Sequence, residues 1–316
     1  MIMGGDEPGA FLPRFEVLIA PPDISPWLAG NTGVPGFTTL DSGQPGPHVG
    51  LVALTHGNEL AGAIVLDAML REGVPIQAGR LTLGFNNLDA FARFDAKQPT
   101  ASRFVDEDFN RLWSPATLDG PRQSSELTRA REIRPLVHQF DVLLDLHSML
   151  WPSDPLILSG PSTKGRDLAL AIGTPELVVA DHGHVSGPRL IDYAAFTGEG
   201  RAAGALVEAG QHWEPATVDA TRACIAGLLR CTGLVPGPAP ATTSRLAEVT
   251  MAVTAATAAF SFVQAFRGGD IIAERNTLIA MDGTTEIRTP HDDCLLVMPS
   301  LRPSRGHTAV RLARFL

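Results

Sequence analysis

The chain has 316 residues, of which 19% are charged and 44% are hydrophobic, so it can bury a substantial core and is not an intrinsically disordered chain. Its length suits one large α/β domain, alone or with a small appended domain. Acidic residues outnumber basic ones by 34 to 25, and the resulting net charge of −9 argues against a nucleic-acid partner. An anionic small molecule stays compatible with this charge, because one buried arginine can reverse the field inside a pocket.

The cysteines and apolar stretches favour the cytoplasm. The three cysteines are widely spaced and form no C-x-x-C pair, which predicts reduced thiols rather than disulfides: Cys224, Cys231 and Cys294. The N-terminal residues lack the basic start and apolar run of a signal peptide. The apolar stretch Met251–Phe266 is too short and too often interrupted by polar residues to span a bilayer, so no membrane partner is expected.

In chain order, a long connection precedes an alternation of strands and helices. The Pro- and Gly-rich stretch Ala20–Pro47 predicts little regular structure. The β-prone runs that follow are His48–Thr55, Arg80–Phe85, Asp141–Leu146, Leu156–Leu158, Leu177–Ala180 and Gly204–Val207, and the helical runs are Glu59–Arg71, Ser124–Gln139 and Thr217–Leu234. This alternation predicts an α/β fold with a mixed, mostly parallel sheet flanked by helices on both faces.

The composition changes after the last predicted helix. Val235–Ser244 is a Pro/Ala/Thr linker, and from Arg245 onward short β-prone stretches alternate with glycine-containing turns. We therefore expect a catalytic domain over residues 1–240 and a small all-β domain over residues 245–316. Free edges of such a β domain can pair across subunits, so a homo-oligomer is compatible with the sequence.

Four ionisable residues stand at the ends of predicted strands: His56, Glu59, His147 and Glu208. Ligands of open α/β sheets bind outside the carboxyl ends of the strands, so these residues are expected to converge. His56 and Glu59 have H-x-x-E spacing, which places both side chains on one side of a turn entering a helix. With His147 they form a two-His, one-Glu set that leaves a fourth position open, as catalytic zinc sites do. H-x-x-E alone is common, and a lone histidine at a strand end is more often structural.

Four motifs in the same order and rough spacing resemble the succinylglutamate desuccinylase/aspartoacylase family: HGNE (56–59), DFNR (108–111), DLHS (145–148) and VEAG (207–210). The resemblance covers nearly the whole chain. It implies a zinc carboxypeptidase-like α/β domain followed by a small β domain. It also implies one Zn²⁺ per chain and a hydrolase that removes the acyl group from a small carboxylate-bearing N-acyl amino acid.

The resemblance also implies a role for each matching residue. His56, Glu59 and His147 match the zinc ligands, Glu208 the glutamate that activates water, Asn110 and Arg111 the pair that grips a substrate carboxylate, and Arg103 the arginine that polarises the scissile carbonyl. The chemistry agrees with these roles. A glutamate can move the proton from water to the leaving amine, and an arginine can hold a carboxylate through two parallel hydrogen bonds.

Other interpretations stay open for several of these residues. Arg111 could instead form a surface ion pair with Asp106 or Glu107. Asp145 could orient a ligand imidazole, with His56 as the favoured partner, or take a solvent-side or capping role.

Further candidates lie outside the four motifs. His182 and His184 belong to a loop that could border the pocket, His212 and Trp213 could line the substrate cavity, and Arg201 could bind a second substrate carboxylate.

The predicted function is therefore a zinc-dependent deacylase, and the sequence leaves the acyl group open. The alternatives are a metallocarboxypeptidase or esterase with the same zinc site, or a pseudoenzyme that binds a metabolite. The last alternative predicts damage to the ligands or the base, whereas all four residues that carry these roles are intact.

Overall fold

The structure, a computed structural model, describes residues 16–184, 186–241 and 243–316. The chain divides into two compact units. The larger comprises Val17–Met149 and Pro155–Ala247, and the smaller includes Leu150–Asp154 and Glu248–Leu316. The described residues of the expected linker, Val235–Ser244, contain no helix or strand, and the division between the units follows Ala247.

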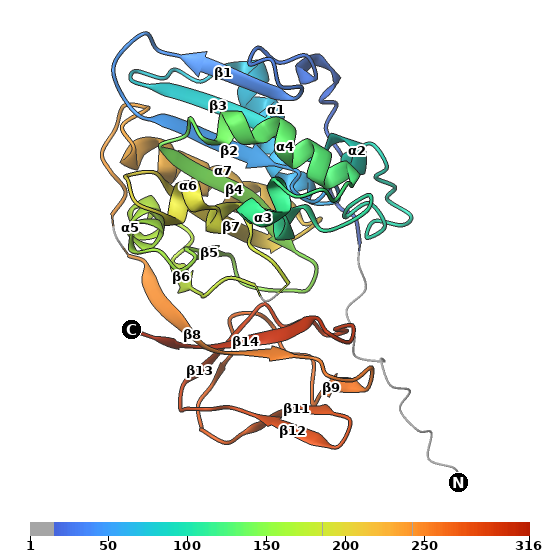
Figure 1. Ribbon diagram of the computed structural model, residues 1–316. Coiled ribbons are helices and arrows are strands. Elements are labelled where there is room, and N and C mark those ends of the chain that lie inside the picture. The colour runs from blue at the N-terminus through green and yellow to red at the C-terminus, as the bar shows by residue number, and fades with distance from the viewer. Residues whose placement is uncertain (1–15, 185, 242) are drawn as a thin grey trace. The chain divides into compact units, whose positions relative to one another are not determined.

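A mixed, mostly parallel sheet forms the centre of the larger unit (Figure 1). Its order is β1-β3-β2-β4-β7-β5-β6. The pairs β2–β3, β2–β4, β4–β7 and β5–β6 are parallel, whereas β1–β3 and β5–β7 are antiparallel. The strands are β1 (Phe37–Asp41), β2 (His48–Ala53), β3 (Arg80–Phe85), β4 (Val142–Met149), β5 (Leu156–Leu158), β6 (Leu177–Ala180) and β7 (Ala203–Gln211).

Helices cover both faces of this sheet, which confirms the predicted α/β class. Figure 1 shows α4 in front of the sheet and α1 and α7 behind it. The α-helices are α1 (Leu60–Glu72), α2 (Leu88–Phe91), α3 (Pro115–Leu118), α4 (Ser125–Val137), α5 (Thr163–Ile172), α6 (Ala194–Thr197) and α7 (Pro215–Cys231). Short 3-10 turns are η1 (Ser25–Trp27), η2 (Phe109–Arg111) and η3 (Leu190–Asp192).

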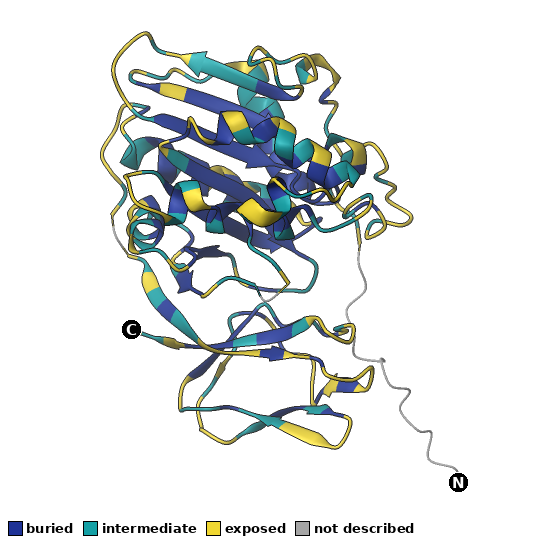
Figure 2. Ribbon diagram, in the orientation of Figure 1, coloured by how far each residue is buried: buried dark blue, intermediate teal, exposed yellow. Residues whose placement is uncertain are grey.

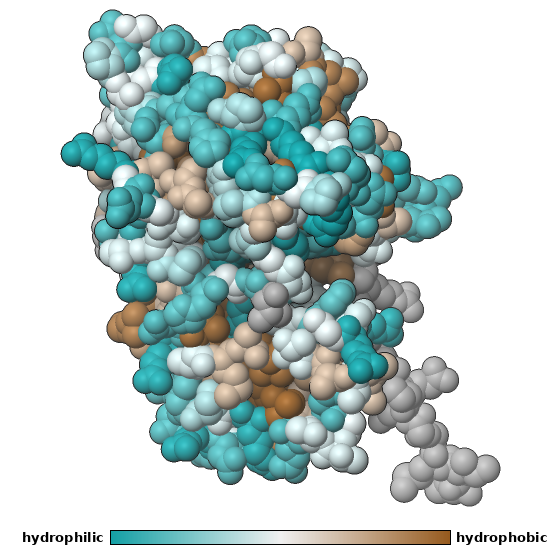
Figure 3. Space-filling model, viewed as in Figure 1, coloured by the Kyte–Doolittle hydropathy of each residue, from teal (hydrophilic) through white to brown (hydrophobic). Residues whose placement is uncertain are grey.

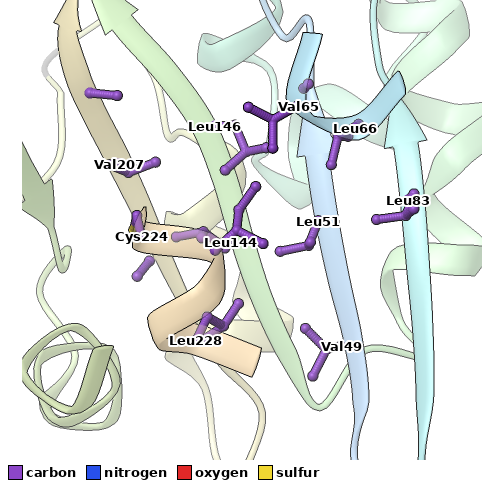
Figure 4. Packing of buried hydrophobic residues seen from close by; sticks show 14 of the residues in the cluster. Val49, Leu51, Val65, Leu66, Leu83, Leu144, Leu146, Val207, Cys224 and Leu228 are labelled. Carbon is purple, nitrogen blue, oxygen red and sulfur yellow. The ribbon is translucent and has the colours of Figure 1, made fainter. Parts of the chain in front are cut away.

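The hydrophobic core decides which side chains of the central strands are left for chemistry. Leu144 and Leu146 of β4 pack with residues of α1 and α7 in one buried cluster (Figure 4). Side chains alternate between the two faces of a strand. Asp145 and His147 therefore point to the opposite face of β4, away from that cluster. The strands around them are almost completely buried (Figure 2).

The smaller unit is all-β in its described residues, as predicted. One set of strands runs β8 (Arg245–Thr254), β14 (Thr308–Phe315), β13 (Cys294–Val297) and β10 (Ile271–Ile272), and a second runs β12 (Thr285–Arg288), β11 (Leu278–Asp282) and β9 (Phe260–Phe262). The apolar stretch Met251–Phe266 contributes strand residues to this unit's own core.

None of the helices that the structure describes is both long and apolar enough to cross a membrane. On the face seen in Figure 3 the surface is mainly hydrophilic, with apolar residues in small groups.

One expectation about local structure was incomplete and another was wrong. The stretch Ala20–Pro47 contains η1 and the strand β1, because β1 gains its hydrogen bonds by pairing with the edge of a sheet formed much later in the chain. His147 and Glu208 lie inside β4 and β7 rather than beyond their ends. Both strands continue past the apolar run because their neighbours supply pairing partners there.

Candidate functional site

The turn between β2 and α1 brings His56 and Glu59 together. His56 follows the strand and Glu59 is the N-cap residue of the helix. A Cβ atom at Gly57 would lie 2.4 Å from backbone atoms of Ala90 and Phe91, so only glycine fits in this turn. The glycine of the HGNE motif therefore permits a close approach of two backbone segments, without adopting a left-handed conformation.

Three buried side chains from β4 and this turn surround one point. His56 Nδ1 lies 2.6 Å from Glu59 Oε1, and His147 Nδ1 lies 2.9 Å from Glu59 Oε2. The three potential ligand atoms lie within 4.8 Å of one another. Two imidazole nitrogens and one carboxylate form a donor set that zinc prefers in catalytic sites.

Two further carboxylates lie against the outer nitrogens of the two imidazoles. His56 Nε2 lies 3.1 Å from Asp108 Oδ1, and His147 Nε2 lies 2.9 Å from Asp145 Oδ2. Thr55 Oγ1 donates to the other oxygen of Asp145 at 2.8 Å. Asp145 therefore orients His147 and not His56, the partner favoured from the sequence. Because such carboxylates turn the Nδ1 atoms toward a shared point, the arrangement fits a bound metal.

The cluster is strongly polarised. Burial alone would raise the pKa of Glu59, but the neighbouring His56 and His147 outweigh it and hold that pKa well below its usual range. Burial alone would lower the pKa of His147, but Asp145 and Glu59 outweigh it and raise that pKa well above its usual value. A cation at this point would meet an ionised carboxylate and would compete with a proton on His147.

Glu208 lies beside this cluster on the neighbouring strand. The parallel register of β4 and β7 pairs His147 with Glu208 directly. Paired residues of adjacent strands point to the same face, with strands about 4.8 Å apart. Glu208 is only 7% exposed. The structure thus brings the predicted acid/base next to a predicted metal ligand.

Arg103 lies at the open side of the cluster. Its Nη2 atom lies 2.9 Å from His56 Nε2 and donates to Asp108 Oδ2 at 3.3 Å, while Nη1 donates to Glu59 Oε1 at 3.3 Å. Its side chain is 36% exposed, so it stays accessible to a ligand. The structure therefore brings this arginine, predicted to polarise a carbonyl, within contact of two predicted metal ligands.

Asn110 and Arg111 follow on η2. The backbone N–H of Leu190 donates to Asn110 Oδ1 at 2.7 Å, so the amide nitrogen of Asn110 is turned toward His147, 3.4 Å from its Nε2. Arg111 Nη2 lies 4.0 Å from Asp108 Oδ2. Asp108 is thus its acidic neighbour, and not Asp106 or Glu107, the alternatives left open by the sequence.

The residues outside the motifs have different positions. His212 is buried, its Nδ1 lies 2.8 Å from Ser148 Oγ, and burial lowers its pKa to about 3, so the ring is neutral beside the cluster. Trp213 is also buried and stacks at an angle on this ring. Arg201 is exposed and precedes β7, whereas Glu208 lies near the far end of that strand, about 16 Å along it at 3.3 Å per residue. The structure therefore does not bring Arg201 to the site.

His182 is exposed, and His184 accepts a hydrogen bond from the backbone N–H of Ser186. Neither histidine joins the cluster of three. The segment after them does border Asn110, because the backbone N–H of Leu190 donates to Asn110 Oδ1.

Two further residues of the quoted motifs contact the cluster, although no role was predicted for them. Asp108 contacts His56 and Arg103, and although burial alone would raise its pKa, these two neighbours and Arg111 lower it. The backbone N–H of Ser148 donates to Glu59 Oε2 at 3.1 Å. Their presence in DFNR and DLHS was the signal that could have found them.

Arg189 had no such signal. It is 3% exposed, binds both oxygens of Asp181 at 2.9 and 2.6 Å, and donates from Nε to Asp192 Oδ2 at 2.8 Å. These bonds fix the backbone beside Leu190, and Leu190 in turn orients Asn110. The role of Arg189 depends on contacts that only the folded chain makes.

Residues 45–155 match the sequence profile of the succinylglutamate desuccinylase/aspartoacylase catalytic domain. The fold is similar to the crystal structure of a succinylglutamate desuccinylase from Vibrio cholerae, with a TM-score of 0.68 and 18% identity over 89% of this chain and 86% of that one. A succinylglutamate desuccinylase/aspartoacylase from Rhodobacter sphaeroides gives a TM-score of 0.66 and 17% identity over 89% and 88%. No curated protein matches the chain significantly.

Proposed function

Because residues 45–155 match the succinylglutamate desuccinylase/aspartoacylase catalytic domain, we propose that the chain is a member of this family and a zinc-dependent hydrolase of a small N-acyl amino acid. The observation that carries the proposal is the cluster of His56, Glu59 and His147 within 4.8 Å, next to a strand-paired Glu208. The matched family consists of deacylases, which supports the proposal that this chain is an enzyme. The two imidazoles and one carboxylate support zinc as its metal.

In this proposal the segment around η2 binds the substrate. The amide nitrogen of Asn110 is turned toward the site and donates to the substrate carboxylate, and Arg111 adds a charge-assisted hydrogen bond. Arg103 places the scissile carbonyl, because its guanidinium contacts the cluster and is still partly exposed. It would stabilise the negative charge that develops on the carbonyl oxygen.

Glu208 carries the proton. It takes a proton from the attacking water and returns it to the leaving amine, a role that needs a carboxylate beside the reacting atoms. Zinc held by His56, Glu59 and His147 would supply Lewis acidity and would make water more acidic. Asp108 and Asp145 keep both imidazoles oriented for it.

The cytoplasm is the proposed compartment, because none of the three cysteines forms a disulfide. The proposed partner is a small carboxylate-bearing substrate, with no role for nucleic acid or membrane.

The test combines metal content, a substrate panel and one variant. We expect about one zinc per chain and chelator-sensitive release of free amine from at least one N-acyl amino acid. Glu208→Gln should lower kcat by roughly 100-fold or more while zinc stays bound. Undiminished turnover by this variant would contradict the mechanism. Cleavage of peptides or esters alone would indicate a carboxypeptidase or esterase, and a protein without metal or zinc-dependent activity would indicate a metabolite-binding role.

A further inference from the structure

The three residues proposed to contact substrate come from one short segment. Arg103, Asn110 and Arg111 lie within nine positions, and the only regular structure among them is the single turn η2. Neither a strand nor a long helix fixes this segment. Its backbone is attached to the rest of the unit by a hydrogen bond from the N–H of Gly57 to the carbonyl of Arg103 at 3.1 Å, and by side chains from elsewhere.

Glu126 of α4 supplies this support. Its carboxylate accepts hydrogen bonds from three consecutive backbone N–H groups, those of Val105 at 2.6 Å, Asp106 at 3.0 Å and Glu107 at 3.2 Å. A fourth bond comes from Asn87 Nδ2 at 3.0 Å. Glu126 has no exposed surface, so its two oxygens are satisfied by these donors and not by water.

The segment binds back to the same helix. Asp106 Oδ2 accepts hydrogen bonds from the backbone N–H and the hydroxyl of Ser125, both at 2.7 Å. Residues 105–107 thus donate hydrogen bonds to Glu126, and Ser125 at the start of the same helix donates hydrogen bonds to Asp106. This double attachment fixes the backbone between Arg103 on one side and Asn110 on the other.

We propose that Glu126 is a positioning residue for the substrate-binding segment. The proposal rests on the proposed hydrolase function for its catalytic consequence. Glu126 touches neither the metal-ligand cluster nor substrate; it sets where Arg103 and the Asn110–Arg111 pair stand. A misplacement of about 1 Å in such groups costs roughly 100-fold in rate.

The test uses Glu126→Gln in the full chain. The amide keeps the shape of the side chain but has one oxygen, so at least one backbone N–H loses its acceptor. We expect a decrease in kcat/KM of roughly 10–100-fold, with unchanged zinc content. Glu132→Gln is the matched control, because Glu132 lies on the same helix with its side chain 44% exposed. The control should keep wild-type kinetics.

Two readouts separate positioning from mere stabilisation. Backbone amides of residues 105–107 should exchange hydrogen roughly tenfold faster or more, without a matching change in the rest of the larger unit. The difference in kcat/KM between wild type and variant should also be smaller for a substrate whose carboxylate is replaced by a carboxamide. Such a substrate has no carboxylate for Asn110 and Arg111 to bind. Unchanged exchange at 105–107, or wild-type kcat/KM in the folded variant, would overturn the proposal. The exchange measurement does not depend on turnover, so it tests the proposal even if no N-acyl amino acid is cleaved. Absence of cleavage would overturn the proposed function and not the role of Glu126.

Discussion

The backbone N–H of Leu190 and the side-chain oxygen of Asn110 lie 2.7 Å apart, and this bond decides which half of the amide faces the candidate site. A backbone N–H can only donate, so it must meet Oδ1. Nδ2 then faces His147, 3.4 Å from its Nε2. The bond to Leu190 thus leaves the N–H donors of the amide on the side of the candidate site, and an anion needs such donors.

Replacing Asn110 by aspartate tests that direction. The carboxylate still accepts the Leu190 N–H, but it offers an oxygen where the donor was. We expect KM for N-acyl amino acids to rise roughly 10–100-fold, the loss of a hydrogen bond to a charged group, about 1.5–3 kcal/mol. Steady-state kinetics with metal analysis would check this. Asn276→Asp, at an exposed position, is the control, and an unchanged KM for Asn110→Asp would rule out a role in carboxylate binding.

The apparent zinc affinity of the site should change with pH in the range around pH 7. Burial would lower the pKa of His147, but Asp145 and Glu59 outweigh it and raise the pKa well above its usual value. A metal must displace that proton, so the apparent zinc affinity should fall about tenfold per pH unit for each proton displaced as the pH decreases. Competition with a chromophoric chelator between about pH 6 and pH 8.5 would measure it.

The matched variant for this measurement is Asp145→Asn. It removes one of the carboxylates that raise the pKa of His147, so the pH dependence should weaken near neutrality. It should also weaken zinc binding by about 10–100-fold, because the imidazole loses the group that orients it. A wild-type affinity that is constant from about pH 7 to pH 8 would contradict the proposed ligand role of His147.

Arg189 should matter for stability. Replacing it by methionine leaves the carboxylates of Asp181 and Asp192 buried without their cation. We expect the free energy of unfolding to decrease by about 3–5 kcal/mol, as for other broken buried ion pairs. Urea denaturation would measure the difference. Arg201→Met, at an exposed position, should change the stability by no more than about 0.5 kcal/mol, and an equal effect of both variants would show that the buried cluster contributes nothing specific.

The strands and helices around the site could be predicted because each has a local pattern. Arg80–Phe85, Leu156–Leu158 and Leu177–Ala180 begin and end where their β-prone runs do. The edge strand β1 could not be predicted, because its Thr-rich sequence becomes a strand only by pairing with β3. The ends of β4 and β7 were misplaced for the same reason, since their last residues are paired by neighbouring strands and not marked by apolar alternation.

The sequence by itself determined the residue types and their order: H-x-x-E before a helix, a later histidine, and an Asn-Arg pair between them. The four motifs that contain these residues carry the family resemblance, and that resemblance predicted a metal cluster with an anion clamp without coordinates. Only the tertiary structure decided the partners. Asp145 lies against His147 and Asp108 against His56, while Glu126 and Leu190 form hydrogen bonds with residues 105–110 from distant segments. Such partners are chosen by distances between elements far apart in the chain, and no local pattern in the sequence records those distances.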